Sequence, residues 1–172
     1  MSACSNKQVV RKFVRAQNAY DFNRVAALVD GQYREYLWDG SLEMSDTAQF
    51  RSFLEWRAIM ASKISIKKIQ NLDKSRVQTT ETNQSYLDKA LGLKPRTFAI
   101  TYLFEEGELL YTKIDTIEGN AQITVYNQTR IKHFREFCTQ HQMKLSFAMN
   151  AQEARQLKKA LQSYQEACPK VQ

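Results

Sequence analysis

The chain has 172 residues, of which 43% are hydrophobic and 25% charged, a balance typical of one globular domain and not of a disordered or fibrous chain. Its longest uninterrupted apolar run, Val25–Val29, is far shorter than the roughly 20 residues that a membrane-spanning helix needs. The net charge is +7, and residues 119–172 hold eight Lys or Arg against three Glu. Such a basic segment could contact an acidic partner or nucleic acid, but a solvated helix face is the simpler interpretation.

The three cysteines, Cys4, Cys138 and Cys168, show no paired spacing, and an odd number cannot all form disulfides within one chain. A reducing compartment is therefore the simpler expectation. The segment Met1–Cys4 resembles the end of a bacterial lipoprotein signal, but the sequence lacks the charged and apolar stretches that precede such a site. We therefore predict a cytoplasmic protein with no membrane contact.

Two amphipathic helices are predicted at the start of the chain. Ser5 and Gln8 have the spacing of a capping box, and apolar residues follow at helical spacing as far as Gln17. Asp21 is a candidate N-cap for a shorter second helix. That helix is expected to end at Asp30–Gly31, with one apolar face formed by Val25, Leu28 and Val29.

From Gln32 to Trp38 the hydrophobic period changes to two, which predicts a strand, and Asp39–Gly40 predicts a hairpin turn after it. A short returning strand over residues 41–44 and a third helix capped by Ser45 or Asp46 follow. Four more strands are predicted at residues 63–71, 76–83, 96–105 and 109–118, with about one helical turn in the connection 84–95.

The remainder of the chain is predicted to be mainly helical. A first helix carries Ile131, Phe134 and Phe137, and a second begins with a capping box formed by Asn150 and Glu153. A strand over residues 143–149 is expected between them. We therefore divide the chain into a domain at 1–118 and a basic, mainly helical extension at 119–172.

This order of elements resembles the SnoaL-like branch of the nuclear transport factor 2-like superfamily. Three segments carry the resemblance: Tyr20–Phe22 between the first two helices, Tyr36–Gly40 in the hairpin and Phe50–Leu54 on the third helix. The resemblance extends from Val9 to about Glu118. It implies an α+β fold, in which a curved antiparallel sheet forms a cone packed by three N-terminal helices, and a pocket opens at one end. It also implies a homodimer formed through the outer face of the sheet.

Several kinds of chemistry lack their sequence signatures. The five glycines are too dispersed for a dinucleotide-binding or phosphate-binding loop, and no GxSxG elbow occurs. The only histidines, His133 and His141, have no carboxylate or cysteine at a recognised metal spacing. We therefore predict neither a cofactor nor a metal ion.

Some enzymes of the resembling superfamily use a carboxylate in an apolar pocket for isomerisation, cyclisation or dehydration. Asp115 is the first candidate base, since Lys113 and Tyr111 lie on the same strand face. Glu81 is the second candidate, with Tyr102 as a possible hydrogen-bond donor. The alternative interpretation of Asp115 is a polar group paired with Lys113 on the solvent-facing side of the sheet, because strand register decides which face is inside.

The most apolar strand face comprises Phe98, Ile100, Tyr102 and Phe104, which makes it the natural interior of the cone. Aromatic side chains offer apolar area with a polar tip and could line a ligand pocket, although they are equally typical of a core or a dimer interface. The candidate pocket residues are Tyr36, Trp38, Trp56, Phe98, Phe104 and Tyr111.

The leading hypothesis is a domain that binds a small apolar or mixed ligand, with or without catalysis. One alternative is a cofactor-free isomerase, cyclase or dehydratase that uses Asp115 or Glu81. Another is an interaction module that binds an acidic partner or nucleic acid through the basic extension. Because no base-stacking motif accompanies the basic residues, nucleic acid is the least favoured partner.

Overall fold

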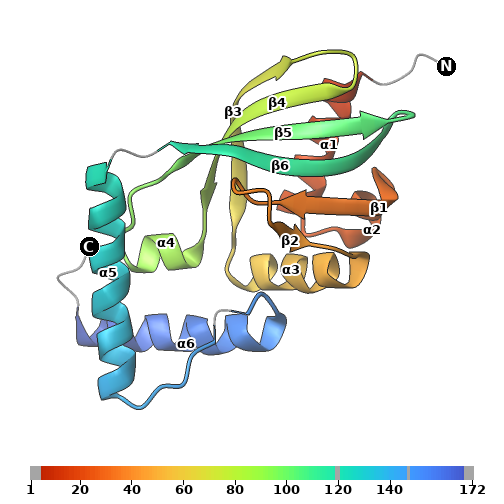
Figure 1. The fold of residues 1–172 in the computed structure, drawn as a ribbon. Coiled ribbons are helices and arrows are strands. Elements are labelled where there is room, and N and C mark those ends of the chain that lie inside the picture. Colours follow the sequence, from red (N-terminus) through yellow and green to blue (C-terminus); the bar gives the residue numbers. More distant parts are fainter. Residues whose placement is uncertain (1–4, 119–120, 147, 169–172) are drawn as a thin grey trace.

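The computed structural model describes residues 5–118, 121–146 and 148–168, so the lipoprotein-like Met1–Cys4 lies outside it. A curved sheet forms one side of the molecule, and the N-terminal helices cover its inner face (Figure 1). A second group of helices, from the C-terminal part of the chain, lies beside this unit (Figure 1). Within the described ranges, no helix has the length and apolar character that crossing a bilayer requires.

The three N-terminal helices begin at caps that the sequence predicts. Helix α1 (Asn6–Asn18) begins after Ser5, which forms the expected capping box with Gln8. Helix α2 (Phe22–Ala26) is capped by Asp21, and α3 (Thr47–Ile59) by Asp46, whose side chain accepts a hydrogen bond from the Gln49 backbone N–H. These side-chain acceptors satisfy backbone donors that have no partner inside the helix.

The predicted end of α2 at Asp30–Gly31 is wrong. The helix ends at Ala26, and strand β1 (Val29–Tyr36) already begins at Val29. The Leu109 backbone N–H donates to the Leu28 carbonyl, and Val29 pairs with Leu109. Val29 therefore belongs to a strand because it pairs with β6, which is distant in the sequence, although its local periodicity predicted a helix.

The sheet has six strands in the order β2-β1-β6-β5-β4-β3. Neighbouring strands are antiparallel, except that β1 runs parallel to β6. Gly40 (φ +81°) and Gly107 (φ +91°) adopt the left-handed conformation that the two predicted hairpin turns require. The remaining strands are β2 (Leu42–Met44), β3 (Lys63–Asn71), β4 (Arg76–Gln84), β5 (Thr97–Glu105) and β6 (Glu108–Glu118).

The first hydrophobic core lies between helices α1 to α3 and the inner face of the sheet. Phe13 is its centre, with its ring near those of Tyr33, Phe50 and Tyr102. Tyr102 and Phe104 are buried, so the strand face that the sequence analysis assigned to the interior does point inward. Burial of this aromatic set supplies much of the driving force that holds the helices in the concave side of the sheet.

A second core is built by α4 (Tyr86–Ala90), α5 (Ala121–Gln140) and α6 (Ala151–Ala167) together with Met60 at the end of α3. Phe134 and Leu161 are fully buried in it. Asn127 on α5 bonds both the backbone N–H and the carbonyl of Lys94 at 2.9 Å, which holds the α4–β5 connection against α5. Helix α6 also packs against α3, so the C-terminal helices contact the element that closes one side of the sheet.

The strand expected at residues 143–149 does not form in the described part of that segment, which excludes Phe147. Met143 and Leu145 pack against the second core without a strand neighbour. The Met143 backbone N–H donates to the Cys138 carbonyl on α5 and the Ala148 N–H to Ser146 Oγ, so these backbone groups find partners outside a sheet. Half of the capping box expected at the last helix is present, since the Asn150 side chain accepts from the Glu153 backbone N–H. The Asn150 backbone N–H donates to the Ala148 carbonyl and not to the Glu153 side chain.

Candidate functional site

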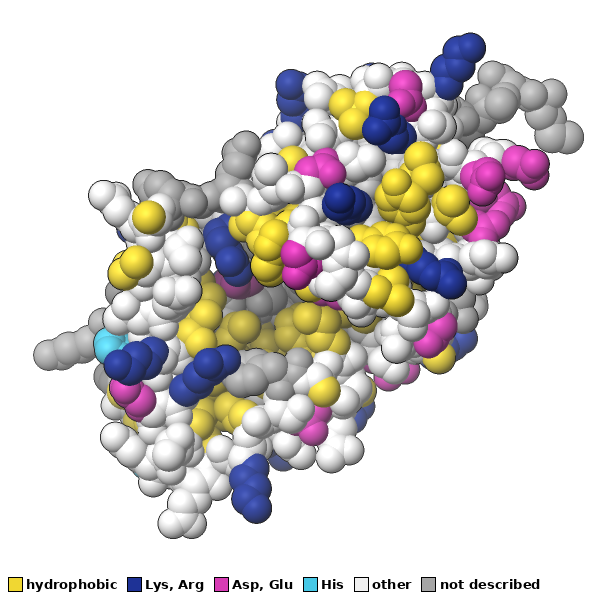
Figure 2. All heavy atoms as spheres, viewed as in Figure 1, with side chains coloured by type: hydrophobic (Ala, Val, Ile, Leu, Met, Phe, Trp, Pro, Cys, Tyr) yellow, Lys and Arg dark blue, Asp and Glu magenta, His cyan; other side chains and the backbone are white. Residues whose placement is uncertain are grey.

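A cavity of about 250 Å³ opens between the inner face of the sheet, α1 and α3. In the space-filling view, hydrophobic side chains line a hollow between the sheet and the C-terminal helices (Figure 2). Aromatic rings and a small set of polar groups make up the cavity wall. The lining includes Phe13, Tyr36, Phe53, Trp56, Phe98 and Tyr102 among aromatic residues, and Glu35, Glu43, Arg57 and Glu81 among charged ones.

Glu81 on β4 is held by two hydroxyl groups. Tyr102 Oη donates to Glu81 Oε1 at 2.7 Å, and Thr79 Oγ1 donates to the same oxygen at 2.5 Å. Tyr102 comes from the neighbouring strand β5, while Thr79 lies two residues before Glu81 on the same strand face. Only 3% of Glu81 is exposed. The carboxyl is therefore fixed in one orientation at the cavity wall.

A second carboxyl, Glu35 on β1, is held in the same way. Tyr33 Oη donates to Glu35 Oε1 at 2.6 Å, and Thr112 Oγ1 on β6 lies 3.2 Å from the same hydroxyl. Because Tyr33 and Glu35 are two residues apart on one strand, both point to the inner face. The cavity thus contains two glutamates from different strands, each braced by a tyrosine.

The positive charge of Arg57 on α3 acts on both glutamates and lowers the pKa of each. Its Nη1 donates to Gln17 Oε1 on α1 at 2.9 Å, and only 3% of the residue is exposed. Its Nε and Nη2 are buried without a hydrogen-bond partner among the described residues. The guanidinium carbon lies 5.5 Å from the Phe53 ring centroid, where the ring face partly offsets the lost hydration.

Burial shifts the pKa of every ionisable group in this cluster. Burial raises the pKa of Glu35 from its ordinary 4.5 to about 7, against a lowering effect from the Tyr33 hydrogen bond. Burial likewise raises the pKa of Glu81, while the Thr79 and Tyr102 hydrogen bonds and Arg57 act in the opposite direction. The pKa of Arg57 is lowered by burial, and the nearby Glu35 opposes this. Glu35 therefore changes its charge near neutral pH.

The cavity connects with a shallower groove on the side of β2 and α3. Glu43, Phe53 and Met149 line both spaces, so they lie where the two meet. Glu43 is an exposed residue, yet partial desolvation raises the pKa of its carboxyl. Met149 comes from the segment just before α6, which brings the C-terminal part of the chain to this boundary.

Five of the candidate site residues lie at the cavity: Glu81, Tyr102, Tyr36, Trp56 and Phe98. Three others lie elsewhere. Trp38 in the β1–β2 turn is 56% exposed, and Phe104 is part of the first core. Tyr111 does not line the cavity, but its ring lies edge-on to Tyr36 at 5.5 Å between centroids.

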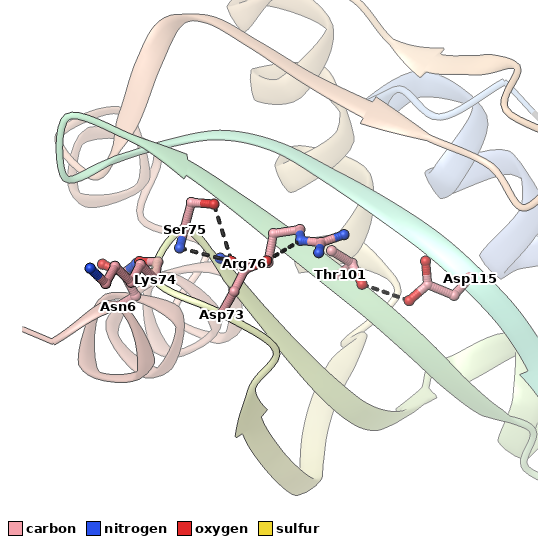
Figure 3. Close-up of polar contacts among 7 residues, drawn as sticks. All are labelled: Asn6, Asp73, Lys74, Ser75, Arg76, Thr101 and Asp115. Atoms are coloured by element: carbon pink, nitrogen blue, oxygen red, sulfur yellow. Dashed lines mark hydrogen bonds and ion pairs between the residues drawn. The ribbon is translucent and has the colours of Figure 1, made fainter.

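Asp115, the first candidate base, lies on the opposite face of the sheet. Its Oδ2 accepts hydrogen bonds from Thr101 Oγ1 at 2.7 Å and Gln78 Nε2 at 2.9 Å (Figure 3 draws the Thr101 bond). Ile114 and Thr112 point into the cavity, so strand alternation turns Asp115 and Lys113 outward. Asp115 is therefore on the outer face, as the alternative interpretation expected, but it bonds Thr101 and Gln78 and forms no ion pair with Lys113.

Figure 3 also shows the contacts that hold the turn between β3 and β4. The β3–β4 turn is closed by Asp73, which accepts from the Ser75 backbone N–H at 2.9 Å and from Arg76 Nε at 2.7 Å. Asn6 Nδ2 donates to the Lys74 carbonyl, which joins the start of α1 to this turn. These contacts fix the strand that carries Glu81 relative to the helix that carries Gln17.

Glu35, Glu43 and Arg57 are the charged groups of the cavity that the sequence analysis did not identify. The alternation that placed Tyr33, Glu35 and Leu37 on one side of a strand contained a usable signal, because Tyr33 and Glu35 share the inner face. It did not reveal which face is buried, since β1 pairs with β6, far away in the sequence. Arg57 was assigned to the apolar stripe of the third helix and not to a site.

This arrangement provides two carboxyls and hydroxyl donors in a largely apolar wall. Two titratable groups in different environments are the usual basis of acid and base roles in one site. Among the residues that the structure describes, no three His, Cys, Asp or Glu side chains gather as metal ligands would. Binding of a small molecule and proton transfer to or from it are thus the activities that the geometry can carry.

No family model matches the sequence, and no curated protein matches it. Solved structures do match the fold. An uncharacterised cystatin-fold protein from Novosphingobium aromaticivorans aligns with a TM-score of 0.55 at 18% identity, over 64% of this chain and 97% of that one. An NTF2-like protein of unknown function from Cytophaga hutchinsonii aligns with a TM-score of 0.53 at 13% identity, over 69% and 95%.

A Pseudomonas putida protein provisionally described as a polyketide cyclase aligns with a TM-score of 0.50 at 20% identity, over 72% of this chain and 98% of that one. At such identities the likeness concerns the fold alone. The chain shares with these structures an α+β fold in which a curved sheet is packed by N-terminal helices, as the sequence resemblance implied.

Proposed function

We propose that the protein binds a small, mainly apolar molecule in the cavity between the sheet and α3. The observation that carries this proposal is the cavity itself, about 250 Å³ in volume, with aromatic walls and a few fixed polar groups. Ligand sites are typically concave, mostly apolar and supplied with a small number of oriented polar groups. The volume is just below the roughly 300–1,000 Å³ of typical ligand sites, which favours a compact ligand.

A cavity-filling substitution tests this function. Ile114 lines the cavity, whereas its neighbour Lys113 points to the outer face. We expect thermal-shift screening of small apolar compounds to yield ligands that stabilise the protein and lose this effect with Ile114→Trp. Lys113→Trp, the matched control, should keep it. Equal stabilisation of both variants would place the ligand elsewhere and contradict the proposal.

A second candidate function is proton transfer without a cofactor, and the Tyr102–Glu81 hydrogen bond of 2.7 Å favours it. A base held in a fixed direction within an apolar wall is the arrangement that general base catalysis requires. Glu35, with its pKa raised to about 7 by burial, supplies a second group for the proton. Isomerisation, cyclisation and dehydration all need such a pair.

An enolisable ketone tests this second function. We expect 2-tetralone to exchange its α-protons with D₂O faster in the presence of the protein, as followed by proton NMR. Glu81→Gln should remove most of the acceleration, and Asp115→Asn, on the outer face, should leave it unchanged. Acceleration that survives Glu81→Gln would exclude Glu81 as the base.

The interaction module on the basic extension remains a separate hypothesis. Lys158 is already engaged, since its Nζ donates to the Ile59 carbonyl and lies 5.4 Å from the Tyr86 ring centroid. Binding to nucleic acid would weaken steeply with salt through counterion release, whereas binding of an apolar ligand would not. A salt titration therefore separates the two.

A further inference from the structure

The charged side chains around the cavity are unequal in number. Glu35, Glu43 and Glu81 supply three carboxyls, and Arg57 supplies one cation. The guanidinium acts electrostatically on Glu35 and Glu81, and it offsets at most one of the three negative charges. With the carboxyls ionised, the cavity therefore carries an excess of negative charge, which a positively charged group would neutralise.

The two inner carboxyls each keep one oxygen without a hydrogen bond. Both bonds to Glu81 end on Oε1, and the single bond to Glu35 also ends on Oε1. Oε2 of each residue accepts no hydrogen bond from the described residues. Neither Oε2 is among the buried side-chain atoms that lack a partner, and both residues line the cavity, so both oxygens are accessible to a donor that a ligand would bring.

Glu43 adds a third acceptor where the cavity meets the outer groove. Its carboxylate makes neither a hydrogen bond nor an ion pair with the described residues. The negative charge of Glu43 raises the pKa of the nearby Glu35 carboxyl. A cation between the two would relieve this repulsion.

The cavity walls also suit a cation. The rings of Tyr36, Phe53, Trp56 and Phe98 line it, and the negative face of an aromatic ring attracts a desolvated cation. Carboxylates combined with several rings are a recurring environment for ammonium groups. The same rings accept an apolar body, so one ligand can use both features.

An anionic ligand on Arg57 is the competing interpretation. Nε and Nη2 of Arg57 have no hydrogen-bond partner among the described residues, but both nitrogens are themselves buried. An anion in the cavity could reach them only after neighbouring side chains had moved. It would also meet the carboxyls of Glu35 and Glu81, which already lie in the field of Arg57.

From these contacts we propose that the cavity recognises a compact apolar molecule with one cationic group, an ammonium or another protonated nitrogen, which lies between the carboxyls of Glu35, Glu43 and Glu81. This inference rests on the small-molecule binding proposed above and names the class of its ligand.

Three probes with six carbons each test the inference: hexylammonium, hexanol and hexanoate, each titrated into the protein. The Trp38→Phe variant serves as the background, so that fluorescence reports on Trp56 at the cavity. We expect the ammonium probe to bind about tenfold or more tightly than hexanol, as a desolvated cation–π contact and a carboxylate partner together imply. Hexanoate should bind most weakly.

Glu43→Gln is the variant that examines the charge, because an exposed residue tolerates substitution. It should weaken binding of the ammonium probe several-fold and leave hexanol unchanged. Glu108→Gln, an exposed acid at the start of β6, is the matched control and should change neither. Equal loss in both variants would indicate a general effect of net charge and would overturn the assigned site.

The pH dependence supplies a second readout. Affinity for hexylammonium, whose amine stays protonated over this range, should rise between pH 6 and pH 8, because ionised Glu35 attracts it and protonated Glu35 does not. The groups that act on Glu35 from the surrounding elements are Tyr33, Glu43, Arg57 and Glu81. Binding should therefore release protons, which calorimetry in buffers of different ionisation enthalpy measures. A flat profile would contradict the role of Glu35.

The outcomes separate this inference from the function on which it rests. Tighter or equal binding of hexanol overturns the cationic class but supports a binding cavity. Preference for hexanoate overturns it in favour of Arg57 as the recognition group. Binding of none of the three probes, together with no ligand in the thermal-shift screen, contradicts the proposed function itself.

Discussion

Tyr102 and Glu81, on neighbouring strands of the sheet, are joined by a 2.7 Å hydrogen bond from the phenol to carboxyl oxygen Oε1 inside the cavity. The bond is a cross-strand contact between two inward-facing side chains. It lowers the Glu81 pKa against the larger raising effect of burial, and burial raises the pKa of Tyr102 itself. The phenol therefore stays a donor while the carboxyl changes its charge.

Tyr102→Phe should raise the pKa of Glu81, because it removes a donor that stabilises the ionised form. We also expect it to lower the free energy of unfolding by about 2 kcal/mol, as for a buried hydrogen bond to a charged group. Carboxyl carbon chemical shifts followed by NMR against pH measure the first effect, and urea denaturation measures the second. Tyr111→Phe, outside the cavity, is the control, and an unchanged Glu81 titration in Tyr102→Phe would contradict the assigned role.

Glu35 should make the protein less stable as pH rises towards neutrality. In the unfolded chain this carboxyl loses its proton near its ordinary pKa of 4.5, whereas burial in the folded chain raises the pKa to about 7. The folded state therefore holds the extra proton between these values, so stability falls across that window by up to about 3 kcal/mol and is then constant.

Glu35→Gln removes this titration and keeps an acceptor for Tyr33. The difference in the free energy of unfolding between pH 5 and pH 7.5 should shrink in the variant relative to the parent protein. Urea denaturation at the two pH values measures it, with the exposed Glu108→Gln as the control. If the variant retained the parent's slope, the pKa of Glu35 would have to be near its ordinary value.

Asn127→Ala should weaken the attachment of α5 to the rest of the molecule. The substitution removes two hydrogen bonds of 2.9 Å and leaves the backbone N–H and carbonyl of Lys94 without these partners. We expect a loss of about 2 to 3 kcal/mol in the free energy of unfolding. Thermal denaturation checks this, and the exposed neighbour Gln128→Ala should be neutral.

The homodimer that the family resemblance implies can be tested on the outer sheet face. Leu103 on β5 pairs with Tyr111 on β6, and both side chains are partly exposed there. Leu103→Lys would place a charge in a shared interface, so it should convert a dimer to a monomer in sedimentation experiments. Glu106→Lys in the β5–β6 turn is the control. A parent protein that sediments as a monomer would exclude the dimer.

Much of the fold was predictable because its signals are local. The capping residues Ser5, Asp21 and Asp46 and the Asp39–Gly40 turn act on backbone groups within a few residues of themselves. The local signals gave the wrong result at Val29, because pairing with β6 places this residue in the sheet. They also gave the wrong result at residues 143–146 and 148–149, which pair with none of the described strands.

The candidate site was predictable only in part. Glu81 and Tyr102 followed from the apolar face of two neighbouring strands, but the choice between Glu81 and Asp115 depended on register. Each strand has two faces, and alternation alone assigns residues to one or the other without saying which is buried. The parallel pairing of β1 with β6 is what turns Glu35 inward beside Thr112.

The sequence by itself determined the helix starts, the hairpin turns and most of the strands, because caps, glycine conformations and hydrophobic period are properties of neighbouring residues. Only the tertiary structure decided which carboxyls share the cavity with Arg57. Glu35, Arg57 and Glu81 come from β1, α3 and β4, and the side chains meet because the sheet curves around the helices. Their burial, and with it the Glu35 pKa of about 7, is a property of that packing and not of any one segment.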